Sequence, residues 1–303
     1  MKNLSPAQEV QAAIEVSCSK KNIKKKILTM IDSSPAILVK IEEGVQAINE
    51  WRSKEYSYPA KNKRLEALSE INLEDFVKDV MTVVLPLTKP TLLTNVSGQL
   101  ANHLGFENKR DGIITAAEIL AVLSSADLFD LKKNQKYSSI YLHNRYKAPQ
   151  SLLEFIHQTK YLPPMVCEPR ILTKNSDSAH ITVKDHIFLG KEGNYHNGNM
   201  CLDNLNRLNR IPFSLNVAML TQFSETPKKL LKTKETKDNW EKMVRDSYEV
   251  YTDLVHKGNK FWIPNKPDTR GRTYSQGYHV SPQGNSFRKS IIQFNKKQLV
   301  EGV

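Results

Sequence analysis

The sequence is poor in cysteine and contains no long hydrophobic segment. Its 303 residues include only Cys18, Cys167 and Cys201, which lie far apart and form no CxxC pair. This argues against a disulfide-stabilised fold and for free thiols in a reducing compartment. No apolar stretch approaches the ~20 residues that a membrane span needs, and the first residues, MKNLSPAQEV, lack the apolar core of a secretion signal. We therefore expect a cytosolic protein that does not enter a membrane.

Acidic residues are also scarce relative to basic ones. Lys and Arg number 44 against 32 Asp and Glu, which gives a net charge of +12. Such an excess favours polyanionic partners, most often nucleic acid, because neutralising phosphates releases counterions. A soluble protein that is merely basic stays open as the alternative. The length is sufficient for about two domains of the usual ~100–200 residues.

Most of the first hundred residues carry helix signals. Ser5 and Gln8 have the spacing of a capping box, with Pro6 at the first helical position. The basic run at 20–26 is more typical of a solvated helix face than of a binding site. Amphipathic helices are predicted over 35–51 and 72–85, the second capped by Asn72, and an apolar helix is predicted over 115–123.

A hairpin signal interrupts these helices at 128–144 (LFDLKKNQKYSSIYLHN). Two short segments with β-branched and aromatic residues flank a polar centre, as in a β-hairpin. The tip carries three lysines and a tyrosine, Lys132, Lys133, Lys136 and Tyr137. The segment either contacts nucleic acid or is an exposed hairpin that is basic because the whole protein is basic.

The region from 161 to 200 is irregular. Its first part, YLPPMVCEP at 161–169, cannot be a regular helix or a central strand because of its prolines. Beyond it, the spacing of His180, His186 and His196 matches no standard zinc pattern. We expect loops jointed by glycine here, without a metal site.

Two helices are predicted ahead of residue 260. Ser214 is a candidate cap for the first, over 215–223. Asp238 and Glu241 have the spacing of a capping box for the second, which Gly258 would end. Residues three to four apart predict a buried stripe on the second helix, consisting of Trp240, Val244, Tyr248, Tyr251 and Val255.

The stretch 261–274, FWIPNKPDTRGRTY, places two arginines around one glycine. Arg270 and Arg272 are suited to phosphate because a guanidinium is planar, always charged and able to donate two parallel hydrogen bonds. Gly271 allows a backbone conformation that a Cβ would forbid. Asp268 can turn the loop by accepting backbone N–H bonds, and Tyr274 offers a ring to a sugar or base. These features indicate a clamp for a phosphate backbone.

A second turn, SPQGN at 281–285, follows this loop. The side chains of Gln283 and Asn285 offer amide groups that can hydrogen-bond sugar or phosphate. We count both among the candidate nucleic-acid-binding residues.

The two turns together resemble the DxxGR segment of the single-subunit RNA polymerases of phages and mitochondria. In that family an aromatic-rich FxxP precedes D-x-R-G-R-x-Y, and P-Q-G-N or a near relative follows. The segment 202–216 (LDNLNRLNRIPFSLN) resembles the asparagine-bearing helix that lies before the family's thumb, and 161–169 resembles a proline-rich segment before that. The hairpin at 128–144 stands where the family has its strand-separating hairpin.

Two departures from the family pattern matter. The family transfers nucleotides on two metal ions held by aspartates, in motifs well downstream of DxxGR. Here 31 residues follow Arg272, and among them only Glu301 is acidic. Asn216 and Phe261 lie 45 positions apart, which leaves a short thumb at about 214–258. The chain thus resembles the amino-terminal part of such an enzyme made separately, like the smaller subunit of the two-chain RNA polymerase of certain podovirus coliphages.

The resemblance implies a fold and its division. We expect a mainly α protein with small β-hairpins (α+β), having a helical N-terminal domain over 1–160. The start of a polymerase core with a reduced thumb would occupy 161–303 and include the DxxGR loop at 264–285.

The resemblance also implies a subunit of a DNA-directed RNA polymerase that is inactive alone. Arg270, Arg272 and Tyr274 would hold template DNA or RNA–DNA hybrid, and Asp268 and Gly271 would support the active site. No cofactor is expected on this chain, and Mg²⁺ is expected on a second subunit that carries palm and fingers. The enzyme would act in the cytoplasm of an infected bacterium, and a DNA-loading helper protein stays open.

Two alternatives remain from the residues alone. One is a truncated piece of a one-chain RNA polymerase, and the other is a stand-alone nucleic-acid-binding transcription regulator. Co-purification with a second chain would separate a subunit from both.

Overall fold

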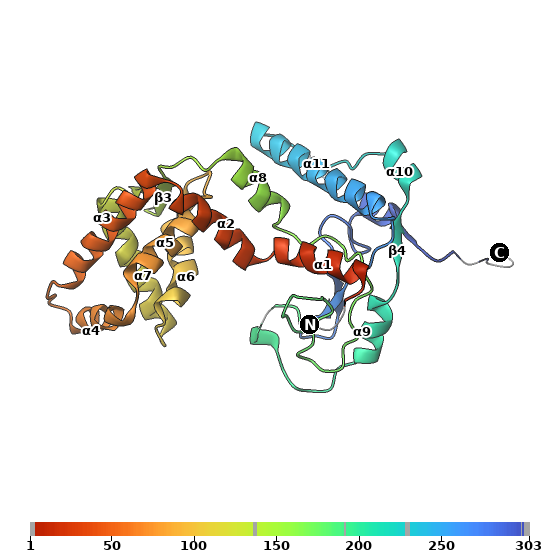
Figure 1. The fold of residues 1–303 in the computed structure, drawn as a ribbon, viewed down its shortest axis with the longest axis horizontal. Helices are drawn as coiled ribbons and strands as arrows, with labels where there is room; N and C mark the ends of the chain where they lie inside the picture. Colours follow the sequence, from red (N-terminus) through yellow and green to blue (C-terminus); the bar gives the residue numbers. More distant parts are fainter. Residues whose placement is uncertain (1–3, 136–137, 191, 228–230, 298, 300–303) are drawn as a thin grey trace. The chain divides into compact units, whose positions relative to one another are not determined.

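The computed structural model describes residues 4–135, 138–190, 192–227, 231–297 and 299. The chain divides into two compact units, whose elements can be followed in Figure 1. The helical unit is Lys21–His157, and the mixed unit joins Met1–Lys20 with Gln158–Val303. The boundary drawn from sequence, after residue 160, gave the first 20 residues to the helical domain, whereas the structure groups them with the C-terminal part.

The helical unit is built from amphipathic helices joined by short turns. Asn72 caps the central helix α5 as expected, because its side chain accepts the N–H of Asp75 at 3.2 Å. The predicted helices over 35–51 and 72–85 are therefore confirmed, and the one over 115–123 is part of a longer helix. The helices of this unit are α2 (Lys20–Asp32), α3 (Pro35–Arg52), α4 (Pro59–Ala67), α5 (Leu73–Val84), α6 (Leu93–Leu100), α7 (Lys109–Ser125) and α8 (Gln150–Gln158), with 3₁₀ turns at Leu68–Glu70 and Ala101–Leu104.

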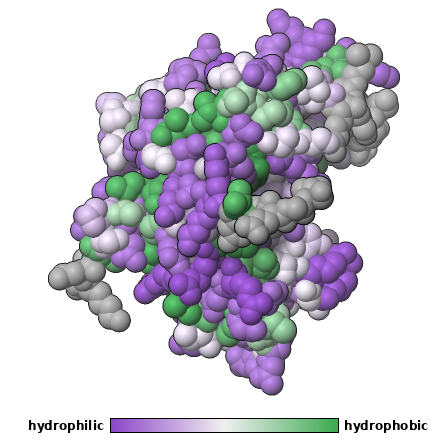
Figure 2. All heavy atoms as spheres, turned by 90° about the vertical axis from the view of Figure 1, so that its right-hand side faces the viewer, coloured by the Kyte–Doolittle hydropathy of each residue, from purple (hydrophilic) through white to green (hydrophobic). Residues whose placement is uncertain are grey.

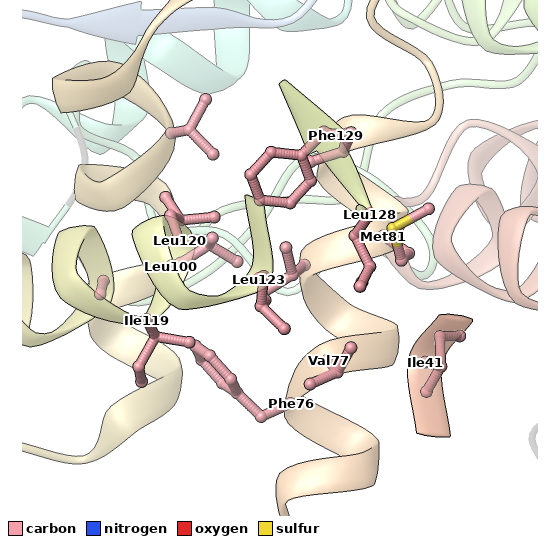
Figure 3. Close-up of a cluster of buried hydrophobic side chains, with 14 of the residues drawn as sticks. Ile41, Phe76, Val77, Met81, Leu100, Ile119, Leu120, Leu123, Leu128 and Phe129 are labelled. Atoms are coloured by element: carbon pink, nitrogen blue, oxygen red, sulfur yellow. The ribbon is translucent and has the colours of Figure 1, made fainter. Parts of the chain in front are cut away.

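The hydrophobic core of this unit lies between α3, α5, α6 and α7 (Figure 3). Helix α5 buries residues three to four positions apart, including Phe76, Val77 and Met81, as an amphipathic helix must. Gly44 lets α3 approach α7 closely, since a Cβ at that position would lie 2.8 Å from Leu123. Leu128 completes the core where the chain leaves α7.

The predicted hairpin is confirmed and gains a third strand. Strands β2 (Phe129–Lys133) and β3 (Ile140–Asn144) pair antiparallel, with Lys133 opposite Ile140 at the tip end. The short strand β1 (Thr91–Leu92) adds to the other edge of β3. Strand β1 was not predicted, because two residues carry too little periodicity to be recognised.

The mixed unit contains small sheets connected by long irregular segments. Strand β4 (Phe213–Leu215) pairs with β7 (Ile292–Phe294), and β5 (Asn265–Pro267) pairs with β6 (Thr273–Ser275). Single bridges join Phe213 to Phe261 and Met165 to Trp262. The helices of this unit are α1 (Pro6–Ser17), α9 (Leu202–Asn209), α10 (Val217–Gln222), α11 (Lys234–His256) and α12 (Ser286–Ser290), with a 3₁₀ turn at Glu192–Asn194. The mainly α, α+β fold is therefore as expected.

Helix α1 is anchored by two buried polar side chains that sequence reasoning did not single out. Its capping box at Ser5 forms as predicted. Gln11 accepts the N–H of Val166 at 2.9 Å. Glu15 is 1% exposed and accepts backbone N–H bonds from Ile181 (3.0 Å) and its two successors. Burial raises the pKa of this carboxyl, but hydrogen bonds from His180, the backbone and Gln11 hold the pKa well below its usual range.

Two predicted helix starts are wrong. Ser214 does not cap a helix, because it lies in β4 and the side chain of Asn216 caps α10 instead. Helix α11 begins at Lys234, where Thr233 and Thr236 form the capping box, and not at Asp238. The threonine pair satisfies the first N–H groups five residues before the acidic pair that the pattern favoured.

The predicted stripe of α11 is only partly buried. Tyr251 is buried as expected, but Val255 is exposed, and the remaining buried positions are Ser247 and Leu254. The buried face is therefore rotated away from Val255.

Polar side chains dominate much of the surface. On the face shown in Figure 2, hydrophilic residues predominate and hydrophobic ones lie in patches between them, which is usual for a water-facing surface. None of the helices in the described part of the chain is long and apolar enough to cross a membrane.

Candidate nucleic-acid interface

The arginine-bearing loop is the tip of the β5–β6 hairpin. Pro267 pairs with Thr273, and the N–H of Asp268 donates to the carbonyl of Arg272 at 2.8 Å. The N–H of Gly271 returns to the carbonyl of Asp268 at 3.0 Å, and Gly271 has a φ of +79°. This matches a three-residue hairpin loop closed by a left-handed residue, which favours glycine. The sequence D-T-R-G-R thus encodes the turn and exposes its arginines.

Asp268 organises the loop through both carboxylate oxygens. Its Oδ1 accepts the backbone N–H groups of Arg270 and Arg272, at 2.9 and 3.0 Å. Its Oδ2 accepts the two guanidinium groups, with distances between 2.9 and 3.2 Å. The carboxylate side chain is only 12% exposed, whereas those of Arg270 and Arg272 are 69% and 52% exposed. One shielded anion therefore presents two cations to solvent.

Tyr274 lies beside Arg272 as the sequence suggested. The guanidinium carbon is 5.6 Å from the ring centroid, within the range of a cation–π contact. Hydrogen bonds with Tyr274 and Asp268 raise the pKa of Arg272 above its usual value. The structure thus brings four predicted residues together with Gly271 in one exposed loop.

Gln283 is bound to the hairpin itself. Its Oε1 accepts the N–H of Ser275 at 2.9 Å, and its Nε2 donates to the carbonyl of Thr273 at 3.0 Å. The amide thereby pairs with the outer edge of β6 as a neighbouring strand would. Contact of Gln283 with nucleic acid stays a prediction, and its observed role is to hold the loop.

Asn285 also has partners within the protein. Its Oδ1 accepts the N–H of Arg288 at 2.9 Å and caps α12, while its Nδ2 donates to Glu225. Glu225 in turn pairs with Arg288 at 3.1 Å, and the two side chains are 3% and 15% exposed. This buried ion pair ties α12 to the segment before α11. Contact of Asn285 with nucleic acid likewise stays a prediction.

Support for the hairpin comes from residues that sequence reasoning missed. The N–H of Leu189 donates to the carbonyl of Pro267 at 2.9 Å, and Lys266 binds Asp185 and the carbonyl of His186. These contacts join segments about 80 residues apart, so no local pattern could reveal them. The hairpin is consequently held from the side by the irregular region.

The asparagines of α9 and the segment after it support the fold in three different ways. Asn206 exchanges both amide atoms with the backbone of Leu172, at 2.8 Å each. Asn209 is buried and accepts the backbone N–H of Asn265 at 2.8 Å, next to the arginine loop. Asn216 caps α10. The repeated asparagine was the only signal in the sequence. In the structure these side chains hydrogen-bond backbone groups that would otherwise lack partners.

No protein-family model matches the chain. The chain is similar to a probable DNA-directed RNA polymerase of Agaricus bitorquis, with 29% identity over 175 residues. The match covers 45% of this chain, which spans only 15% of the length of that relative. The similarity supports a relationship of this chain to RNA polymerases.

The lysines of the β2–β3 hairpin lie on the helical unit. Lys132 and Lys133 are exposed in β2, and Lys132 lies 3.7 Å from Asp130. Lys136 and Tyr137, the other two candidates at this tip, lie outside the described residues. Near the base of the hairpin, Arg145 binds Asp130 at 2.7 Å, which fixes the end of β3.

Metal-binding residues were not expected on this chain. Within the residues that the structure describes, no group of three or more His, Cys, Asp or Glu side chains could hold a metal ion.

Proposed function

We propose that this chain is a nucleic-acid-binding subunit of a DNA-directed RNA polymerase. Its β5–β6 loop contacts the phosphates of template DNA or of the RNA–DNA hybrid, next to an active site that a second chain completes. The observation that carries the proposal is the pair of exposed arginines held by Asp268. The similarity to a probable DNA-directed RNA polymerase supports the same class of ligand.

The loop chemistry is suited to phosphate. Asp268 holds both guanidiniums through Oδ2, so a phosphate oxygen arriving from solvent finds their remaining N–H donors already aligned. Because the hairpin is fixed by Leu189, Lys266 and Gln283, the donors are positioned before the ligand arrives. Preorganisation of this kind reduces the entropy lost on binding.

Catalysis belongs to another part of the enzyme in this proposal. A second subunit with palm and fingers supplies the aspartates and their Mg²⁺, and the chain alone synthesises no RNA. The same loop contacts would serve a longer, one-chain form of the enzyme. Template-dependent incorporation of nucleotides by the purified 303-residue chain would contradict the assignment of catalysis elsewhere.

Replacing Arg272 with alanine tests the loop directly. We expect weaker binding to an RNA–DNA hybrid, with a slope of log K against log salt smaller by about 0.7–0.9 for one lost phosphate contact. Thermal unfolding should be unchanged because the side chain is exposed. The measurement is fluorescence anisotropy of a labelled hybrid over a series of salt concentrations.

Arg210 provides the matched control. It is also an exposed arginine of the mixed unit, paired with a carboxylate, Glu168, at 2.7 Å. Arg210→Ala should leave the salt slope unchanged. Equal effects of the two substitutions, or unfolding of Arg272→Ala, would assign Arg272 a structural role.

For the β2–β3 hairpin we propose strand separation at the upstream edge of melted DNA. Exposed Lys132 and Lys133 support contact with phosphate, and Tyr137 is the residue expected to stack on the last closed base pair. Unstacking a step costs a few kcal/mol, which such a wedge partly offsets. Replacing 132–137 by a Gly-Ser turn in the assembled enzyme should impair initiation on duplex templates and largely spare pre-melted ones. Equal loss on both templates would contradict this role.

A further inference from the structure

A polar cleft of about 1070 Å³ opens in the irregular region of the mixed unit. Its wall includes Asp185 and His186, the two residues that bind Lys266 of β5. Behind it, Phe188 and Leu172 belong to a small buried cluster that gives the region a firm base. The cleft therefore shares Asp185 and His186 with the support of the arginine loop.

The charges that line the cleft are unevenly compensated. Asp177 already accepts two N–H groups and a hydroxyl from the turn at 173–174, and Asp185 is paired with Lys266. Among the lining cations, Lys20, Arg170 and Lys184 have no carboxylate partner within the described part of the chain, and they outnumber the one lining carboxylate without a partner there, Glu192. The guanidinium of Arg170 makes one long hydrogen bond, 3.4 Å, to the carbonyl of Ile181. An anion entering the cleft would meet free donors.

An aromatic ring accompanies these cations. Tyr195 lines the cleft and is 37% exposed. Its ring meets Phe188 edge-on, with centroids 6.0 Å apart and an interplanar angle of 90°. Its hydroxyl donates to Asn197 at 2.6 Å, so both ends of the side chain are fixed. A fixed, exposed tyrosine that lines the same cleft as cations is suited to the stacking of an unpaired base.

We propose that this cleft binds a phosphate and the adjoining base of a single-stranded nucleic acid. Arg170 and Lys184 take the phosphate charge, and Tyr195 takes the base. The volume is of the order of a small-ligand site, ~300–1,000 Å³, which admits a nucleotide unit but not a duplex. The site is distinct from the arginine loop, although Asp185 and His186 of its wall also bind Lys266 of the hairpin.

The first experiment measures the charge contribution. A labelled 12-nucleotide polythymidine strand is titrated against Arg170→Ala/Lys184→Ala over a series of salt concentrations. Loss of two phosphate contacts should lower the salt slope by about 1.4, given ~0.7 per contact on single strands. The control, Lys109→Ala/Arg110→Ala, removes the same two side-chain types from an exposed position on α7 and should leave the slope unchanged. Equal slopes for the two double variants would overturn the proposal.

The second experiment locates the base. A strand carrying 5-iodouracil is irradiated with the wild-type protein, and adducts are mapped by mass spectrometry. We expect an adduct on Tyr195 that is lost in the Arg170→Ala/Lys184→Ala variant and retained in Arg272→Ala. Retention in Arg272→Ala separates failure of this site from failure of the loop. Adducts only outside the cleft, or complete competition by millimolar ATP against the strand, would overturn the assignment to single-stranded nucleic acid.

Discussion

Gly271 offers the sharpest test of how the arginine loop is built. Its φ of +79° lies in the left-handed region, yet no atom lies within 4 Å of the place where a Cβ would stand. Alanine there is strained by its own backbone and by nothing else, at ~1–2 kcal/mol. Part of this is offset, because alanine lowers the entropy of the unfolded chain by ~0.4–1 kcal/mol. We expect Gly271→Ala to lower the free energy of unfolding by about 1 kcal/mol.

Urea unfolding followed by tryptophan fluorescence measures this difference, and Gly271→Asn is the control. Asparagine enters the left-handed region more readily than alanine, so it should restore most of the loss although its side chain is larger. If asparagine were as damaging as alanine, the backbone explanation would fail. A loss above ~3 kcal/mol for either variant would reveal a steric contact, of the size seen in overpacked sites.

Two further predictions concern buried charges. Glu15 has a lowered pKa in the folded state, so its ionised form stabilises the docking of α1 above the unfolded pKa of ~4.3. That stability is lost as the pH falls from there towards the lowered folded pKa. Hydrogen exchange in residues 6–17 should therefore accelerate below about pH 4 in the wild type, and already at pH 7 in Glu15→Gln. Exchange that does not change in Glu15→Gln would refute this. Glu225→Ala leaves Arg288 buried without its partner and should lower the free energy of unfolding in urea by roughly 3–5 kcal/mol. Glu168→Ala breaks an exposed pair and should lower it by under ~1 kcal/mol. Similar losses would show that burial is not the cause.

Local signals in the sequence were reliable where one short segment determines the structure. The capping box at Ser5, the cap at Asn72 and the hairpin over 128–144 all form as predicted. The arginine loop belongs to the same class, because Asp268 and Gly271 define its turn within five residues. Each of these features satisfies its backbone groups with side chains or backbone groups that are close in the sequence, so the local pattern was sufficient to predict it.

Signals failed where the partner is distant in the chain. The pairing of β4 with β7 joins Ser214 to Gln293, and a three-residue strand has no periodicity of its own. The burial of Glu15 depends on N–H groups near residue 181 that have no helical or strand partner. An acidic residue in a helix is usually solvated, so its sequence neighbourhood gave no reason to expect otherwise. The residues at the tip of the arginine loop were predicted, whereas the distant residues that support the β5–β6 hairpin were not.

The discontinuous make-up of the mixed unit has a consequence for synthesis on the ribosome. Helix α1 is made before the helical unit, but the backbone groups that Glu15 binds belong to residues 181–183, which are made after it. At ~5–20 residues per second, α1 waits roughly 10–30 s for them, while the whole of Lys21–His157 has already emerged. The inserted helical unit can therefore fold first, and the sheet that closes the mixed unit forms only after Phe294 is made. A ribosome stalled between these points would carry a folded helical unit and a helix α1 whose Glu15 carboxylate is still hydrated.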